Sequence, residues 1–156
     1  MKPTPLANVA KIIMGQSPPS TTYNSEGIGL PFFQGKADFT DLYPTIRMFC
    51  SKPNKVAKPG DILISVRAPV GPTNVCLAKS CIGRGLAAIR ALEDLSSTYL
   101  LYFLRFYEPE LAESGKGSTF SAISRSDLEA IKIPLPPLEE QQRIAEVLAR
   151  ADRLRR

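Results

Sequence analysis

The stretch that decides the fold is the tail of the chain, Ile131-Lys132-Ile133-Pro134-Leu135-Pro136-Pro137-Leu138-Glu139-Glu140-Gln141-Gln142-Arg143-Ile144-Ala145-Glu146-Val147-Leu148. Its three prolines fix φ and push the residues before them toward β or polyproline II conformations, so no helix runs through 134–137. Pro137 can occupy a first helical turn, and Glu139 and Glu140 favour the positive end of the helix dipole. The pattern predicts a short extended segment followed by a long C-terminal helix.

Five apolar residues of that helix form a stripe at or beside heptad spacing: Ile144, Val147, Leu148, Ala151 and Leu154. Such a stripe normally packs on its own domain. This helix, however, would span about 19 residues, or about 28 Å, which is longer than a domain of this size readily covers. We therefore expect the helix to protrude and to bind a partner helix, including that of a second copy of the chain.

The composition is that of one globular domain with a basic balance. The 156 residues are 44% hydrophobic and 22% charged, and the net charge of +5 corresponds to a pI of about 9.2. This balance fits nucleic acid as a partner, although many unrelated proteins share it. No apolar run approaches the roughly 18 residues that span a bilayer, and the start of the chain has no apolar signal-peptide core. We expect a cytoplasmic protein without membrane contact.

Strand signals come first and helix signals follow, which predicts an α+β fold with a twisted mixed or antiparallel sheet, a few helices and a protruding C-terminal helix. The prolyl-glycyl turn at 58–61 is typical of a type II turn. We expect a strand or a turn-rich segment at 6–14 and extended segments at 28–34, 43–50, 62–66, 75–78 and 86–89. A helix over 98–106 should begin after Ser96 or Ser97 and be interrupted by Pro109, and Ser124 with Asp127 should cap a short helix.

Residue types for catalysis and metal binding are scarce. The absence of histidine removes the commonest general base and every histidine-dependent triad. The three cysteines (Cys50, Cys76 and Cys81) form no Cys-x-x-Cys pair, so buried or half-buried thiols are expected rather than a zinc site. The sequence predicts no catalytic residue, no metal and no cofactor.

Several loops place polar or basic residues beside glycine, which lets the main chain approach a phosphate closely. Arginine can hydrogen-bond to the edge of guanine, and glutamine and asparagine can do so to the edge of adenine. Lysine can bind a phosphate. The candidate DNA contacts are Gln34, Lys36, Arg67, Thr73, Asn74, Arg84, Lys116 and Ser118. Arg84 lies between Gly83 and Gly85 and is expected to anchor or read DNA, whereas Arg90 is expected to be a plain surface charge. The alternative is that these are solvated loop residues and that the glycines form a strand bulge.

The tail and several upstream segments together resemble the DNA-specificity subunits of type I restriction-modification systems. The family pattern Pro-Leu-Pro-Pro-x-x-Glu-Gln-x-x-Ile, followed by a long helix, is matched by Pro134, Leu135, Pro136, Pro137, Glu140, Gln141 and Ile144. Further matches are, in order, Lys58-Pro59-Gly60-Asp61-Ile62-Leu63-Ile64-Ser65, Ile82-Gly83-Arg84-Gly85, Ala87-Ala88-Ile89, Tyr99-Leu100 with Tyr102-Phe103-Leu104, Gly115-x-Gly-Ser-x-x-x-x-Ile-Ser and Leu128-x-x-Ile131. The resemblance therefore covers nearly the whole chain.

This resemblance implies a non-catalytic subunit that chooses the DNA sequence, while a methyltransferase subunit and, through it, a restriction subunit act on the DNA. It implies that residues 1–133 form a target-recognition domain for one half of a split site. Residues 134–156 would form a proline-rich junction and the start of a coiled-coil spacer helix. In the family this helix continues and pairs with a second copy; because this chain stops at Arg155-Arg156, it looks like half of such a subunit.

Two other functions compete with this one. A coiled-coil interaction adaptor would use the same helix without meeting nucleic acid. A small metal-dependent nuclease would need its carboxylates, Glu26, Asp38, Asp41 and Asp61, to converge on a metal ion. Asp61 is better explained as a turn residue.

Overall fold

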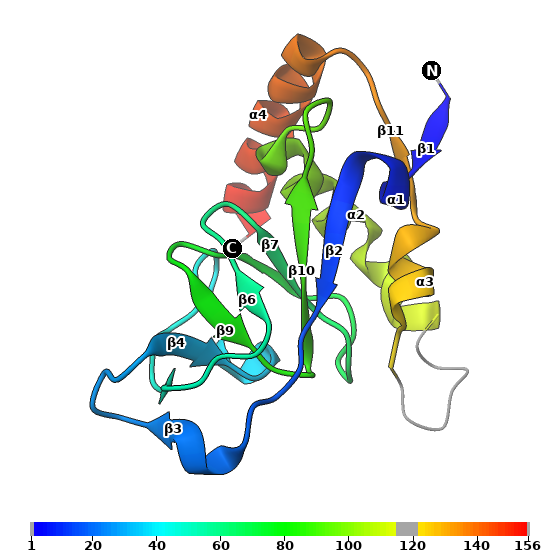
Figure 1. Ribbon diagram of the computed structural model, residues 1–156. Helices are drawn as coiled ribbons and strands as arrows, with labels where there is room; N and C mark the ends of the chain where they lie inside the picture. Colours follow the sequence, from blue (N-terminus) through cyan, green and yellow to red (C-terminus); the bar gives the residue numbers. More distant parts are fainter. Residues whose placement is uncertain (1, 115–121, 156) are drawn as a thin grey trace.

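Helices cover one face of a four-stranded sheet, and a five-stranded sheet lies against its other face (Figure 1). The computed structural model describes residues 2–114 and 122–155. Its elements are β1 (Pro3–Pro5), α1 (Leu6–Val9), β2 (Ala10–Met14), η1 (Ser20–Thr22), β3 (Tyr23–Asn24), β4 (Leu30–Phe33), η2 (Lys36–Asp38), β5 (Phe49–Cys50), β6 (Val56–Ala57), β7 (Ile62–Ser65), β8 (Thr73–Val75), β9 (Ser80–Ile82), β10 (Leu86–Ala91), α2 (Ser97–Ser114), α3 (Arg125–Glu129), β11 (Lys132–Pro134) and α4 (Leu138–Arg155).

The four-stranded sheet is antiparallel throughout, with strand order β2-β10-β7-β8. Side chains alternate between its two faces, as the pleat requires. Ile62 and Ile64 belong to the main core beneath the helices, whereas Leu63 belongs to a second core that faces the other sheet. Because both faces are covered, every residue of β7 is buried, and the first three are apolar.

The five-stranded sheet, with order β3-β5-β4-β9-β6, is built from short strands. All of its pairs are antiparallel except β4 with β9, which run parallel. Parallel neighbours end at the same edge of a sheet. The loops that follow β4 and β9, around residues 34–36 and 83–85, therefore emerge side by side.

The proline-rich tail is joined to the start of the chain. β11 pairs antiparallel with β1, so that Pro134 lies opposite Pro3, and the Leu6 N–H donates to the carbonyl oxygen of Ile131 at 2.8 Å. The predicted extended segment and the predicted helix after it are both confirmed, with α4 beginning at Leu138.

The predicted α+β class, with mixed and antiparallel sheets, is confirmed. Gly60 adopts φ 92°, and the Asp61 N–H donates to the Lys58 carbonyl oxygen at 3.0 Å, as the predicted type II turn requires. The capping box at Ser124 and Asp127 is present at the start of α3.

Three predicted elements were wrong, and in the segment 6–14 a short helix, Leu6–Val9, precedes the strand Ala10–Met14. Only Phe49–Cys50 of the expected strand at 43–50 is extended in a sheet; Thr45 instead donates its N–H to the Asp38 carbonyl oxygen at 2.8 Å, which ties this stretch to η2. The strand expected at 75–78 starts at Thr73 and ends at Val75. Helix α2 passes through Pro109, because Leu111, which is 3% exposed, holds its last turn in the main core and offsets the lost hydrogen bond.

Helix α4 lies along α2, and the two helices contact each other over several turns (Figure 1). One face of α4 carries Gln141, Ala145 and Asp152, which are all buried. The opposite face is exposed to solvent. Within the described residues the helix thus packs on its own domain, as an apolar stripe normally does, whereas its length had led us to expect that it protrudes.

Candidate nucleic-acid interface

Four chain segments converge where β4, β9 and β7 end and β10 begins. The Gly83 N–H donates to the Phe33 carbonyl oxygen at 2.8 Å, and the Val66 N–H donates to the Gly85 carbonyl oxygen at 3.0 Å. The Arg84 N–H donates to Ser17 Oγ at 3.3 Å. These bonds bring the loops 15–17, 33–36, 66–67 and 83–85 to one edge of the molecule.

Two glycines make this convergence possible. A Cβ at Gly85 would collide with the carbonyl oxygen of Gln34, and one at Gly83 would lie 3.0 Å from Ser17 Oγ and 3.3 Å from the Gln34 Cα. Only glycine allows the two loops to pack this closely. The glycines thus allow two parts of the chain to come close together. Arg84, which lies between them in sequence, is exposed to solvent.

Four of the predicted contact residues are brought together here: Gln34, Lys36, Arg67 and Arg84. We call this set the loop edge. All four are exposed, and three carry a positive charge. Arg67 follows Val66 and Arg84 precedes Gly85, so the two arginines lie at the same end of the paired strands β7 and β10. The arrangement therefore holds cations that can bind phosphates, and a glutamine and two arginines that can hydrogen-bond to base edges.

Two of the predicted contact residues are buried. Thr73 and Asn74 lie on β8 and are 5% and 0% exposed. The Asn74 side chain accepts the Thr40 N–H at 3.0 Å and donates to the Thr40 carbonyl oxygen at 2.8 Å. Its hydrogen-bonding groups therefore hold the loop around Thr40 to the sheet and are not available to a base. The predicted contacts Lys116 and Ser118 lie outside the described residues.

Arg47 was missed by the sequence analysis, although it lies beside the loop edge. Its Nη2 donates to Asp38 Oδ1 at 2.6 Å and to the Ala37 carbonyl oxygen at 3.0 Å. The other oxygen of the Asp38 carboxylate accepts the Gln34 N–H at 3.0 Å. Pro44 is the sequence signal that could have identified Arg47. A proline argues against a regular strand through this stretch and so indicates that Arg47 lies in a loop.

Arg90 is not a plain surface charge, so that prediction is corrected. Its Nε and Nη2 donate to the two carboxylate oxygens of Asp61 at 2.9 and 2.8 Å. Asp61 is 2% exposed, and its Oδ2 also accepts the Lys58 N–H at 2.8 Å. The hydrogen bonds to Asp61 raise the pKa of Arg90 above its usual value. Arg90 therefore neutralises a buried carboxylate that also closes the 58–61 turn.

The carboxylates that a nuclease would need do not gather. Asp38 binds Arg47, Asp61 binds Arg90, and Glu26 accepts the N–H of neighbouring Ser25 at 3.0 Å. Within residues 2–114 and 122–155 there is no group of three or more aspartate, glutamate, cysteine or histidine side chains placed to hold a metal ion. The three cysteines are buried, and burial raises the pKa of the Cys76 thiol to about 11.

The stripe on α4 is divided between two environments. Ile144 packs against the main core, and Leu148 faces α2 in a recess that also includes Tyr102 and Phe106. Val147 and Leu154, in contrast, are 64% and 88% exposed. Ala151 is exposed at the rim of the same recess. Only part of the predicted partner surface is therefore open to a partner.

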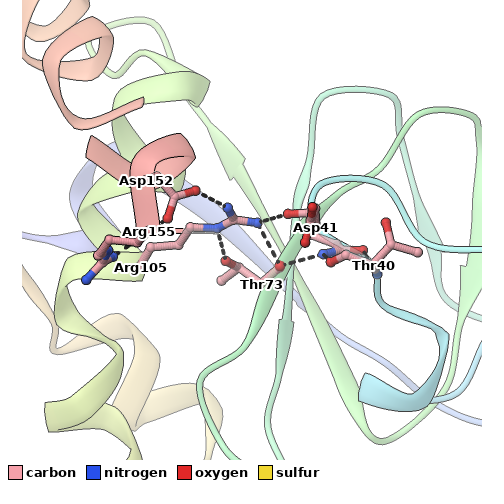
Figure 2. Close-up of polar contacts among 7 residues, drawn as sticks. Thr40, Asp41, Thr73, Arg105, Asp152 and Arg155 are labelled. Carbon is pink, nitrogen blue, oxygen red and sulfur yellow. Dashed lines mark hydrogen bonds and ion pairs between the residues drawn. The ribbon is translucent and has the colours of Figure 1, made fainter. Parts of the chain in front are cut away.

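Arg105 of α2 holds the far end of α4 on the domain (Figure 2). Its Nη1 donates to Asp152 Oδ2 at 2.7 Å, its Nε to Thr73 Oγ1 at 3.2 Å and its Nη2 to the Asp41 carbonyl oxygen at 2.5 Å. The side chains of Arg105 and Asp152 are 8% and 11% exposed. One guanidinium thus ties α4 to β8 and to the loop that follows η2.

Gln141 holds the near end of α4. Its Nε2 donates to the carbonyl oxygens of Asp94 and Pro136 at 2.8 and 2.9 Å, and its Oε1 accepts the Ser96 N–H at 2.8 Å. Gln141 is fully buried. This glutamine of the tail motif therefore fixes the proline-rich junction to the start of α2. We call these two sets of contacts, Arg105 with Asp152 at one end of α4 and Gln141 with its backbone partners at the other, the α2–α4 seam.

Comparison with known proteins gives one consistent family. Residues 1–155 match the family model of the type I restriction modification DNA specificity domain. The type I restriction enzyme MjaX specificity subunit of Methanocaldococcus jannaschii is 53% identical over 145 residues, which are 92% of this chain and 34% of that relative. The MjaIX specificity subunit of the same organism is 34% identical over 97 residues, or 61% of this chain and 22% of that relative.

Solved structures agree with the sequence relatives. The HsdS subunit from Thermoanaerobacter tengcongensis superimposes with a TM-score of 0.89 and 57% identity, covering 98% of this chain and 37% of that one. The S subunit of the type I restriction-modification system from M. genitalium, at 18% identity and a TM-score of 0.74 over 97% of this chain and 38% of that one, shares the fold. The chain thus spans about a third of the length of the relatives it matches. None of the described helices is long and apolar enough to cross a bilayer.

Proposed function

Because the chain belongs to the type I restriction modification DNA specificity domain family, whose members are specificity and not catalytic subunits, we propose that it binds double-stranded DNA sequence-specifically through the loop edge. The observation that carries this proposal is the convergence of Gln34, Lys36, Arg67 and Arg84 from three loops. We further propose that the domain recognises one half of a bipartite site and that it acts in the cytoplasm, where the DNA lies.

The residue types of the loop edge fit a division of labour on DNA. Lys36 and Arg67 hold phosphates, which fixes the register of the domain on the duplex. Arg84 and Gln34 reach base edges in the major groove, where arginine pairs with guanine and glutamine with adenine. The net charge of +5 adds a sequence-independent attraction.

The C-terminal helix is proposed to carry the domain into a larger assembly. In this view residues 1–133 contact DNA, and 134–156 start a spacer that docks on a methyltransferase subunit and, through it, a restriction subunit. The exposed Val147 and Leu154 support this proposal, since a solvent-facing apolar row favours a protein partner. A second copy of this chain is the other occupant that we propose for the same face.

A salt titration tests the proposal with the 156-residue chain and a random-sequence duplex. If about four phosphates are neutralised, log K should fall with log salt with a slope near −3.6. Lys36→Ala should make the slope shallower by about 0.9. The matched control is Lys132→Ala, because Lys132 is an exposed cation on β11, away from the loop edge. A flat titration would contradict DNA binding and favour the adaptor function.

A further inference from the structure

We propose that Arg47 reads a base edge in the DNA target and so helps to determine specificity, with Asp38 as the residue that positions it. The inference rests on the function proposed above and assigns a role to two residues outside the loop edge. The starting observation is that one carboxylate connects Arg47 to the backbone of Gln34.

The hydrogen bonds of Asp38 set the relative position of these two groups. Oδ1 accepts from Arg47 Nη2 at 2.6 Å, and Oδ2 accepts the Gln34 N–H at 3.0 Å. A second bond from Nη2 to the Ala37 carbonyl oxygen, at 3.0 Å, limits rotation of the guanidinium. The Asp38 side chain is only 14% exposed, so a shielded carboxylate orients an arginine at the surface.

The remaining donors of Arg47 make no hydrogen bond to the described part of the chain. Nη2 makes both of its hydrogen bonds to the protein, whereas Nε and Nη1 have no hydrogen-bond acceptor among the described residues. The Arg47 side chain is 58% exposed. A surface ion pair of this kind adds little to stability, but it reduces the rotamer freedom that a flexible arginine loses when it binds a base.

A recess of about 360 Å³ adjoins this pair. Gln34 and Arg47 line it together with the apolar residues Phe32 and Met48. These are the groups that distinguish bases in the major groove: arginine recognises guanine, glutamine recognises adenine, and an apolar surface accepts the thymine methyl. The same combination is not needed to hold a phosphate, for which a cation alone suffices.

The test selects bound duplexes from a randomised DNA library with the unmodified chain and with Arg47→Ala, Arg47→Lys and Asp38→Asn. Kd is then measured for the selected duplex and for the same duplex with each base pair changed in turn. For at least one base pair, Arg47→Ala should lower the discrimination ratio by about 10- to 100-fold. Arg47→Lys keeps the charge and should lose the same ratio while binding unselected DNA as the unmodified chain does. Asp38→Asn should lose part of it.

The outcomes separate the two proposals. If the unmodified chain selects a motif and Arg47→Ala and Arg47→Lys select that motif with the same ratios, Arg47 does not read DNA and the inference is overturned, while DNA binding stands. If the unmodified chain binds no duplex, the proposed function fails and the inference fails with it. Thermal unfolding of each variant, together with Lys132→Ala as the control, shows that a lost ratio does not come from a lost fold.

Discussion

Two arginine–aspartate pairs with nearly the same bond length serve different parts of this molecule. At the seam, Arg105 and Asp152 lie 2.7 Å apart with side chains that are 8% and 11% exposed. Beside the loop edge, Arg47 and Asp38 lie 2.6 Å apart, but the arginine is 58% exposed. In the first pair all three nitrogens of the guanidinium bind the protein, and in the second only Nη2 does. Burial, and not the pair itself, separates an arginine that holds the fold from one that can hold a ligand.

The largest expected effect comes from breaking the buried pair. Arg105→Ala removes the main partner of Asp152 and leaves this carboxylate buried beside Arg155, whose exposed guanidinium is 3.7 Å away. The variant should lose about 3 kcal/mol in free energy of unfolding. Urea denaturation measures this loss, with Arg47→Ala as the matched control, for which less than about 1 kcal/mol is expected. Equal losses would remove the distinction between the two pairs.

Gln141 should have the next largest effect. Gln141→Ala leaves the Ser96 N–H and the carbonyl oxygens of Asp94 and Pro136 without their partner, which should cost about 2 kcal/mol in free energy of unfolding. Gln142 is exposed on the same turn, so Gln142→Ala is the control and should change stability by less than about 0.5 kcal/mol. Two variants of equal stability in urea would show that the seam does not depend on this glutamine.

High pH should weaken the core around Cys76. Burial raises the pKa of this thiol to about 11, from an ordinary value of 9.0. Between these values the unfolded chain has released the proton and the folded protein has kept it, so stability should fall as the pH rises from about 9 to about 11. The loss should be about 1 to 2 kcal/mol in free energy of unfolding. Measurements at pH 8 and pH 10.5 check this, and Cys76→Ala should show a smaller difference between the two.

The smallest effect on stability is expected on the open face of α4. Replacing Val147 and Leu154 by Lys should change the free energy of unfolding by less than about 0.5 kcal/mol, because both are largely exposed. Any self-association should nevertheless fall, since an unpaired charge is costly to bury in a helix contact. Sedimentation velocity measures the association state. Ile144→Lys is a useful contrast, because Ile144 packs on the main core and its replacement should destabilise the domain itself.

Local sequence signals predicted the local parts of the structure well. The 58–61 turn, the buried strand after it, the Ser124 capping box and the break before α4 each depend on residues close in sequence, whose φ preferences and capping groups are intrinsic. The strand expected at 43–50 was wrong although the apolar residues alternate there. Pro44 disfavours a regular strand, and the hydrogen bonds of Thr45 and Arg47 to Asp38 hold the stretch in another conformation.

Contacts between residues far apart in sequence were not predictable from one chain. Arg105 and Asp152 are 47 positions apart, and neither residue type signals a partner. Asn74 was a plausible reader of adenine by residue type, but its burial depends on how β8 packs against the loop at Thr40. The sequence predicted the residues of the loop edge from their types. It did not predict that their loops lie together, because this follows from the parallel pairing of β4 and β9.

The most direct test of the central claim compares Arg84→Ala with Arg90→Ala in DNA affinity and in stability. Arg84 is exposed at the loop edge, and Arg90 neutralises the buried Asp61. Arg84→Ala should weaken binding to the selected duplex by about tenfold or more with an unchanged melting temperature. Arg90→Ala should lower the melting temperature and leave the affinity of the folded protein nearly unchanged. Equal affinities for the two variants, with both still folded, would contradict a DNA-binding loop edge.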